Sequence, residues 1–92
     1  MMAAYSLRQA EQMLTTAMDS LKLSRDELKH LKKMDYRKQA ICWYLKQNSS
    51  VRSQWITEQL YMGDAGNTSL ATRNVKNATD GPLFEMRKAI SQ

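Results

Sequence analysis

The chain has 92 residues and a formal net charge of +5, and 42% of its residues are hydrophobic. This length suits one domain with a modest core. The single cysteine, Cys42, excludes an intramolecular disulfide and a cysteine-based zinc site, and it fits a reducing cytoplasm. No long apolar segment is present, so we expect neither a signal peptide nor a membrane span. The basic balance favours an anionic partner such as nucleic acid.

Two helices are predicted in the N-terminal third of the chain. The first covers residues 7–21, where apolar side chains recur at three- and four-residue spacing. The second covers residues 25–33. Ser24 and Glu27 have the spacing of a capping box just before it, in which each side chain accepts a hydrogen bond from the other residue's backbone amide.

Two more helices are predicted in the middle of the chain. Asp35 is placed to cap a helix over residues 36–47, which ends at a short polar stretch. The next helix covers residues 52–62. Gly63 is the expected stop of that helix, because glycine readily adopts the left-handed conformation found at helix C-termini.

The last two predicted helices follow a glycine-containing loop and a second turn. The fifth covers residues 69–78, with Asn67 or Thr68 as its cap. A sixth covers residues 82–90, because Pro82 suits a first helical position. The inward side of the fifth helix is expected to hold its apolar residues Leu70, Ala71, Val75 and Ala78.

The predicted fold is therefore all-α, a small bundle of five or six helices in one domain over residues 1–92. We divide it into N-terminal helices (1–33), a helix-turn-helix core (34–79) and a C-terminal helix (80–92). The core contains the stretch QWITEQLYMGDAGNTSLATRNVKN, which has a helix, a turn and a second helix. Its turn is longer than that of a compact helix-turn-helix, which indicates a looser variant of the Trp-repressor-like kind.

The net charge is concentrated in one segment. Residues 1–30 and 55–92 each hold equal numbers of basic and acidic side chains, whereas residues 31–54 hold six basic residues and one acidic residue. A helix-turn-helix needs such a basic face, since phosphate contacts set its register on DNA while its second helix reads bases. We therefore predict that phosphates are bound by the six basic residues Lys32, Lys33, Arg37, Lys38, Lys46 and Arg52.

One side of the fifth predicted helix is polar, and no acidic residue lies between residues 65 and 79. An arginine here can bind the two major-groove acceptors of guanine, and a lysine can bind guanine or a phosphate. An ordinary solvated helix face has the same composition, so this feature alone does not decide between the two. The predicted base-reading residues are Ser69, Thr72, Arg73 and Lys76, which share one face at three- and four-residue spacing.

The segment MDYRKQAICWYLKQNSSVRSQWITEQLYMG, residues 34–63, resembles the C-terminal part of the REP-associated tyrosine transposases. In that family an Asp-x-Arg-Lys helix start precedes a basic helix, a Thr/Ser pair and a Trp-Ile-Ala-Glu-x-Leu-x-Met-Gly run. Thr57 stands where the family has alanine, and residues 64–77 diverge from the family pattern. The matching residues here are Asp35, Arg37, Lys38, Leu45, Ser49, Ser50, Trp55, Ile56, Glu58, Leu60, Met62 and Gly63.

The resemblance implies a DNA-binding part without the endonuclease that members of this family carry. That endonuclease uses a pair of histidines to hold a metal, and this chain has only His30. We therefore expect no enzyme activity, no metal and no cofactor. The divergence after Gly63 means that the family's DNA target cannot be transferred to this chain.

The sequence leaves two functions open. The first is non-catalytic binding of duplex or hairpin DNA in the cytoplasm, at the nucleoid. The second is a protein-interaction or homodimerisation module that uses the first helix and the apolar residues of the last one. A membrane-surface role is disfavoured, because the basic residues do not lie along one long amphipathic helix. The apolar residues of the last helix are Leu83, Phe84, Met86, Ala89 and Ile90.

Overall fold

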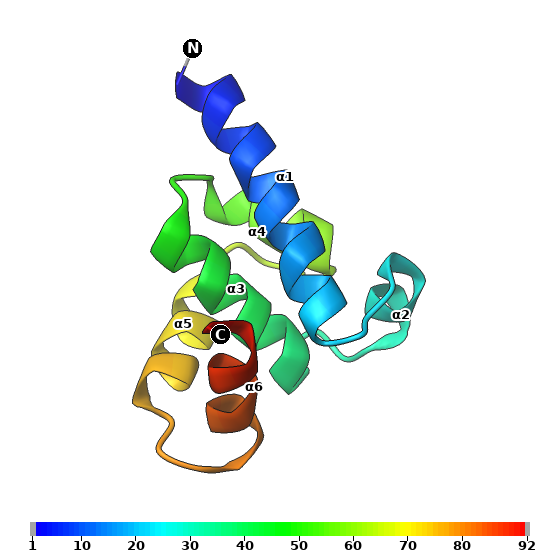
Figure 1. Ribbon diagram of the computed structural model, residues 1–92, viewed down its shortest axis with the longest axis vertical. Helices are drawn as coiled ribbons and strands as arrows, with labels where there is room; N and C mark the ends of the chain where they lie inside the picture. The colour runs from blue at the N-terminus through cyan, green and yellow to red at the C-terminus, as the bar shows by residue number, and fades with distance from the viewer. Residues whose placement is uncertain (1, 92) are drawn as a thin grey trace.

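The computed structural model describes the backbone of residues 2–91 and the side chains of residues 7–91. In that part of the chain it contains six α-helices and no strand, which confirms the all-α prediction (Figure 1). The helices are α1 (Met2–Ser20), α2 (Arg25–His30), α3 (Tyr36–Asn48), α4 (Ser53–Leu60), α5 (Asn67–Asn77) and α6 (Gly81–Ser91).

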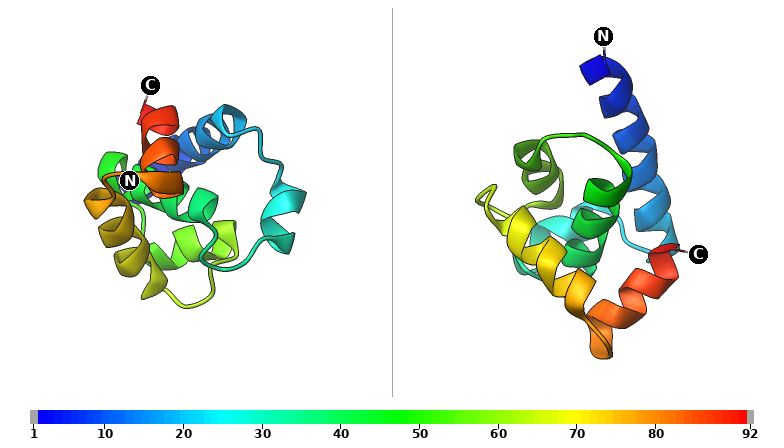
Figure 2. Two further views of the ribbon diagram at one scale, coloured as in Figure 1. Left: turned by 90° about the horizontal axis from the view of Figure 1, so that it is seen from below. Right: turned by 90° about the vertical axis from the view of Figure 1, so that its left-hand side faces the viewer.

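Helix α3 is the centre of the structure and packs against α1, α4, α5 and α6 (Figure 1). Its side chains are buried on several sides, which fits a helix surrounded by others. Ala40, Ile41, Cys42 and Leu45 have no exposed surface. The short helix α2 lies at the edge of the molecule, as the left view of Figure 2 shows. It is attached there by the fully buried side chain of Leu28.

Two of the three helix caps predicted from sequence are confirmed. The third is wrong, because the N-cap of α5 is Gly66, without a side-chain hydrogen bond, and Asn67 and Thr68 lie inside the helix. The backbone amide of Ser24 donates to Glu27 Oε1 at 2.9 Å, and the amide of Glu27 donates to Ser24 Oγ at 3.1 Å. Asp35 is the N-cap of α3, where its Oδ1 accepts from the amide of Arg37 at 2.9 Å. Both caps depend on residues within three positions of each other, which is why the sequence alone identifies them.

The helix boundaries differ from the prediction by two or more residues in four places. Helix α2 ends at His30 rather than at residue 33, and α5 begins at Asn67 rather than at residue 69. Helix α1 begins at Met2 rather than at residue 7. Helix α4 ends at Leu60, and the chain reverses at Tyr61, which adopts the left-handed conformation with φ 56°. Gly63 also has a positive φ, 80°, so it lies inside the turn instead of stopping the helix. The turn therefore begins two residues before the glycine that the sequence indicates.

The buried side of α5 also differs from the prediction. Thr68, Ala71 and Val75 face the core, whereas Leu70 is 39% exposed. Thr68 is accommodated inside because its hydroxyl donates to the carbonyl of Ala65 at 2.9 Å. Since each helical residue turns by about 100°, a stripe through residues 68, 71 and 75 directs residue 70 outward.

Helix α6 is attached to the end of α5. The Arg87 guanidinium donates to the carbonyls of Val75 at 2.6 Å, Lys76 at 3.1 Å and Ala78 at 3.0 Å, at the C-terminus of α5. Side-chain donors of this kind satisfy the carbonyls at a helix end that lack a full set of backbone partners. Ile90 is buried, and Met86 packs against the core. The apolar residues at these positions of α6 are therefore used within the domain.

Lys38 does not lie on the surface, which contradicts its prediction as a phosphate-binding residue. Its side chain is fully buried, and its ammonium donates to the carbonyls of Leu31 at 3.1 Å and Tyr61 at 3.0 Å. Burial lowers the pKa of this ammonium below its ordinary value. Lys38 thus connects the segment before α3 to the turn after α4 and is not available to an external anion.

Replacing Lys38 with methionine tests this connection. Methionine keeps most of the buried aliphatic volume but leaves the two carbonyls without their shared donor. An unsatisfied buried polar group costs about 1–3 kcal/mol, so we expect Lys38→Met to lower the free energy of unfolding by roughly 2–4 kcal/mol in urea denaturation. Lys32→Met, at an exposed lysine, should change it by less than about 0.5 kcal/mol. Equal effects of the two substitutions would contradict the assignment.

Candidate nucleic-acid interface

Helices α4 and α5 form a helix-turn-helix unit whose turn is held by side chains. Asn67 Nδ2 donates to the carbonyl of Met62 at 2.7 Å, and Asp64 Oδ2 accepts from the amide of Gly66 at 3.0 Å. Thr57, where the resembling family has alanine, is buried, and its hydroxyl donates to the carbonyl of Gln54 at 3.0 Å. Asn67 and Asp64 therefore hold the turn itself, whereas the Thr57 hydroxyl bonds within α4.

The outer side of α5 is open and basic. Ser69, Arg73 and Lys76 are all exposed, as predicted for residues that contact a partner. In the right view of Figure 2, α5 crosses the near side of the molecule without another helix in front of it. A shallow hollow of about 440 Å³ lies along this side, lined by Lys46, Ser69, Thr72, Arg73, Lys76 and Asn77.

Lys46 reaches this hollow from α3. Its ammonium also lies 3.4 Å from Ser53 Oγ, at the start of α4. Arg52 is the exposed N-cap residue of α4 and so lies beside the same group. The structure thus brings Lys46, one of the six predicted phosphate-binding residues, together with the predicted base-reading residues, while Arg52 lies at the start of α4. None of the side chains that line the hollow within residues 7–91 is acidic.

Lys33 lies elsewhere, beside the turn between α4 and α5, and Lys32 precedes it in the chain. Both are exposed. The Lys33 side chain passes so close to Gly63 that a Cβ at Gly63 would lie 3.2 Å from Lys33 Cδ. Basic residues are therefore present at both ends of α4, Arg52 at its start and Lys33 after its end.

Arg37, another predicted phosphate-binding residue, is already paired. Its Nε donates to Asp35 Oδ1 at 2.9 Å and its Nη2 donates to Asp35 Oδ2 at 3.0 Å. Partial burial by itself raises the pKa of the Asp35 carboxyl, but the hydrogen bonds and charge of Arg37 outweigh it and hold this pKa below its ordinary value. A guanidinium held in this bidentate pair has fewer free donors for a phosphate.

Thr72 also differs from the prediction, since its hydroxyl points inward. The Oγ1 atom is buried and has no hydrogen bond of ordinary geometry among the described residues. It lies beside the thiol of Cys42, whose pKa is raised to about 11 by burial, an effect that the Thr72 hydroxyl and the charge of Lys46 only partly offset. Thr72 therefore contributes its outer surface to the hollow but no free hydroxyl for a base.

Two exposed residues of α5 were not predicted as part of the interface. Asn77 lines the hollow, four positions after Arg73, and this spacing alone places it on the same face. Leu70 lies on the outer side one turn before Arg73. The sequence gives no signal for Leu70, because an apolar residue in an amphipathic helix is normally assigned to the core.

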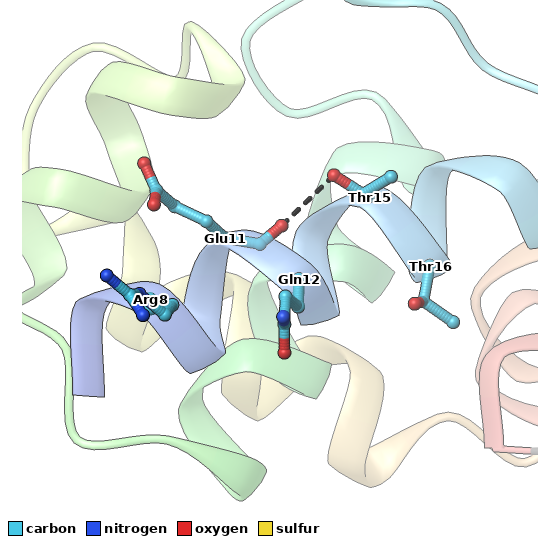
Figure 3. A pocket seen from close by; sticks show the side chains of 5 residues that line it. All are labelled: Arg8, Glu11, Gln12, Thr15 and Thr16. Atoms are coloured by element: carbon cyan, nitrogen blue, oxygen red, sulfur yellow. Dashed lines mark hydrogen bonds between the residues drawn. The ribbon is translucent and has the colours of Figure 1, made fainter. Parts of the chain in front are cut away.

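A second and larger hollow, of about 540 Å³, lies along α1 and is shown in Figure 3. The hydroxyl of Thr15 donates to the carbonyl of Glu11 at 3.1 Å within it. Arg8 and Glu11 contribute opposite charges, so this surface has no excess of positive charge for a polyanion. The five side chains that line it are Arg8, Glu11, Gln12, Thr15 and Thr16.

No family model, curated protein or solved structure that was compared with the chain matches it. The part of the chain that the structure describes contains no cluster of three or more side chains suited to hold a metal ion. None of its described helices is long and apolar enough to cross a membrane.

The buried hydroxyl of Thr72 can be tested through stability. Thr72→Val replaces this hydroxyl with a methyl group of similar shape. It removes a buried polar group that lies beside the weakly bonding thiol of Cys42, and leaving such a group without a full hydrogen bond costs about 1–3 kcal/mol. We therefore expect the free energy of unfolding to rise by about 1 kcal/mol in chemical denaturation. Ser69→Ala, at an exposed hydroxyl on the same helix, is the control and should change it little. A clear loss of stability in Thr72→Val would show that the hydroxyl has a partner.

Proposed function

We propose that this chain binds duplex DNA through α4 and α5, with α5 in the major groove and without catalysing a reaction. The observation that carries the proposal is the hollow on α5. It gathers Lys46, Arg73 and Lys76 with hydroxyl and amide groups on an exposed helix side, and none of its lining residues in the described chain is acidic. Hydrogen-bond donors and positive charge on an accessible helix are what DNA recognition requires.

Arg73 is the best placed residue to read a base. It lies opposite the buried stripe of Thr68, Ala71 and Val75, so its side chain would point to the floor of the groove. An arginine in this position can donate two hydrogen bonds to guanine O6 and N7. Ser69, one turn earlier on the same side, would contact a neighbouring base or a phosphate.

Phosphate contacts would come from both ends of α4. Helix α4 has 8 residues and is therefore about 12 Å long, close to the width of the major groove. Lys46 and Arg52 lie near its start, and Lys33 lies after its end. Basic residues spaced in this way would meet the two phosphate backbones that border the groove.

The resemblance of residues 34–63 to the C-terminal part of the REP-associated tyrosine transposases supports the same partner class. It adds hairpin DNA as a ligand to be compared with a plain duplex. On this proposal the chain acts at the nucleoid. We offer no separate protein-interaction function, because Ile90 is buried and Met86 packs on the core, while the Phe84 ring lies under Arg87 and Lys88, at 5.3 and 5.2 Å.

The proposal predicts salt-dependent binding in which Arg73 matters more than an arginine elsewhere. We would measure fluorescence anisotropy of a labelled hairpin and a random duplex at several salt concentrations. Arg73→Ala should weaken binding by about 1–3 kcal/mol and reduce the preference between the two DNAs. Arg8→Ala removes the same charge from an exposed arginine on α1 and should have a small effect.

The salt dependence gives a second readout of the same experiment. With Lys38 buried and Arg37 paired, four of the predicted phosphate-binding residues remain exposed: Lys32, Lys33, Lys46 and Arg52. At about −0.9 per phosphate, four contacts give a slope near −3.6 in a plot of log binding constant against log salt. Absence of binding to both DNAs at low salt, or equal losses in the two arginine variants, would refute the proposal.

A further inference from the structure

Leu70 is an apolar side chain on an otherwise polar and basic helix side. It is 39% exposed and lies one turn before Arg73, while Ser69 precedes it and Asn77 follows two turns later. The buried stripe of α5 is complete without it. A single exposed leucine is common on protein surfaces, but this one lies on the side of α5 that the proposed function directs toward DNA.

The position of Leu70 relative to Arg73 suits two neighbouring base pairs. Three residues along a helix correspond to about 4.5 Å at 1.5 Å per residue, and the two side chains differ in direction by about 60°. Successive base pairs are about 3.4 Å apart. With Arg73 on one base pair, the Leu70 side chain therefore reaches the edge of the adjacent one.

The major groove offers one apolar group to such a side chain. Bases present hydrogen-bond donors and acceptors there, and thymine adds its C5 methyl, which apolar side chains contact. A methylated cytosine carries a methyl at the same ring position. Leucine has no hydrogen-bond donor or acceptor, so it cannot bond to the polar groups of a base edge. Any such group that it covers is left without a hydrogen-bond partner.

We infer that Leu70 is a specificity-determining residue that packs on the C5 methyl of a pyrimidine, next to the base read by Arg73. The inference rests on the proposed DNA binding and adds to it a chemical preference for a methyl group at one position. Removing this contact leaves about one methyl group unburied. The burial of such a group contributes about 0.8 kcal/mol, so its loss should weaken binding roughly fourfold.

The test uses the best-bound duplex selected from a random pool by the intact chain. This duplex is remade with uracil in place of every thymine, which removes only the C5 methyl groups, and separately with 5-methylcytosine in place of every cytosine. We expect the wild type to bind the uracil duplex about fourfold more weakly, and Leu70→Ala to bind the thymine and uracil duplexes equally. If the methylcytosine duplex alone changes the wild-type affinity, a methylated cytosine is the source of the methyl group.

Leu7→Ala is the matched control, because Leu7 is an exposed leucine on α1 with 37% of its surface accessible. This variant should keep the discrimination between thymine and uracil. The inference is overturned if the wild type binds all three duplexes equally, or if Leu70→Ala, folded by circular dichroism, still discriminates. Failure of the wild type to bind any duplex would instead refute the proposed function, and the inference with it.

Discussion

The buried ammonium of Lys38 connects the segment just before α3 to the turn after α4, which is 23 positions away along the chain. It extends from the first turn of α3 to the carbonyls of Leu31 and Tyr61. Tyr61 has a left-handed backbone, which costs a non-glycine residue about 1–2 kcal/mol, so the turn needs support from its surroundings. Lys38 supports the turn through its hydrogen bond to Tyr61. A second support is the backbone amide of Met62, which donates to the carbonyl of Thr57 at 2.9 Å. The position of α5 relative to α3 and α4 follows from this turn.

Helix α3 both forms the centre of the core and contributes a basic residue to the proposed interface. Its apolar residues and Lys38 form the interior on which the other helices pack. Lys46, near its end, extends instead to the hollow on α5 and lies close to the start of α4. The proposed interface is therefore built on the same helix that organises the core. This arrangement favours a rigid surface, because side chains supported by packed helices are held more precisely than those on loops.

The sequence predicts well those features that depend on neighbouring residues. The capping box of Ser24 and Glu27 and the Asp35 cap were predicted correctly, and all six helices are present near their expected places. The exposed positions of Ser69, Arg73 and Lys76 also agree with the prediction, although their role in DNA binding stays a proposal. In each case a short spacing rule contains the needed information.

The errors concern residues whose environment depends on distant parts of the chain. Lys38 looks like a surface cation until the carbonyl of Tyr61, 23 positions away, is brought to it. Leu70 looks like a core residue, but Thr68 takes the inward place since its hydroxyl bonds locally to Ala65. Thr72 lies at the edge of the buried stripe, and its hydroxyl is buried beside the Cys42 thiol of α3. Charge and hydropathy patterns do not contain these contacts.

The central claim is that the outer side of α5, together with Lys46 of α3, contacts DNA. The most direct measurement is a titration of the ¹⁵N-labelled chain with the bound duplex, followed by amide chemical shifts in NMR spectra. The account predicts that the largest shifts lie at Ser69, Leu70, Arg73 and Lys76, with smaller ones at Lys46 and Arg52. It also predicts no shift at the polar residues that line the hollow on α1, which are Arg8, Glu11, Gln12, Thr15 and Thr16. Large shifts along α1 with none on α5 would contradict it.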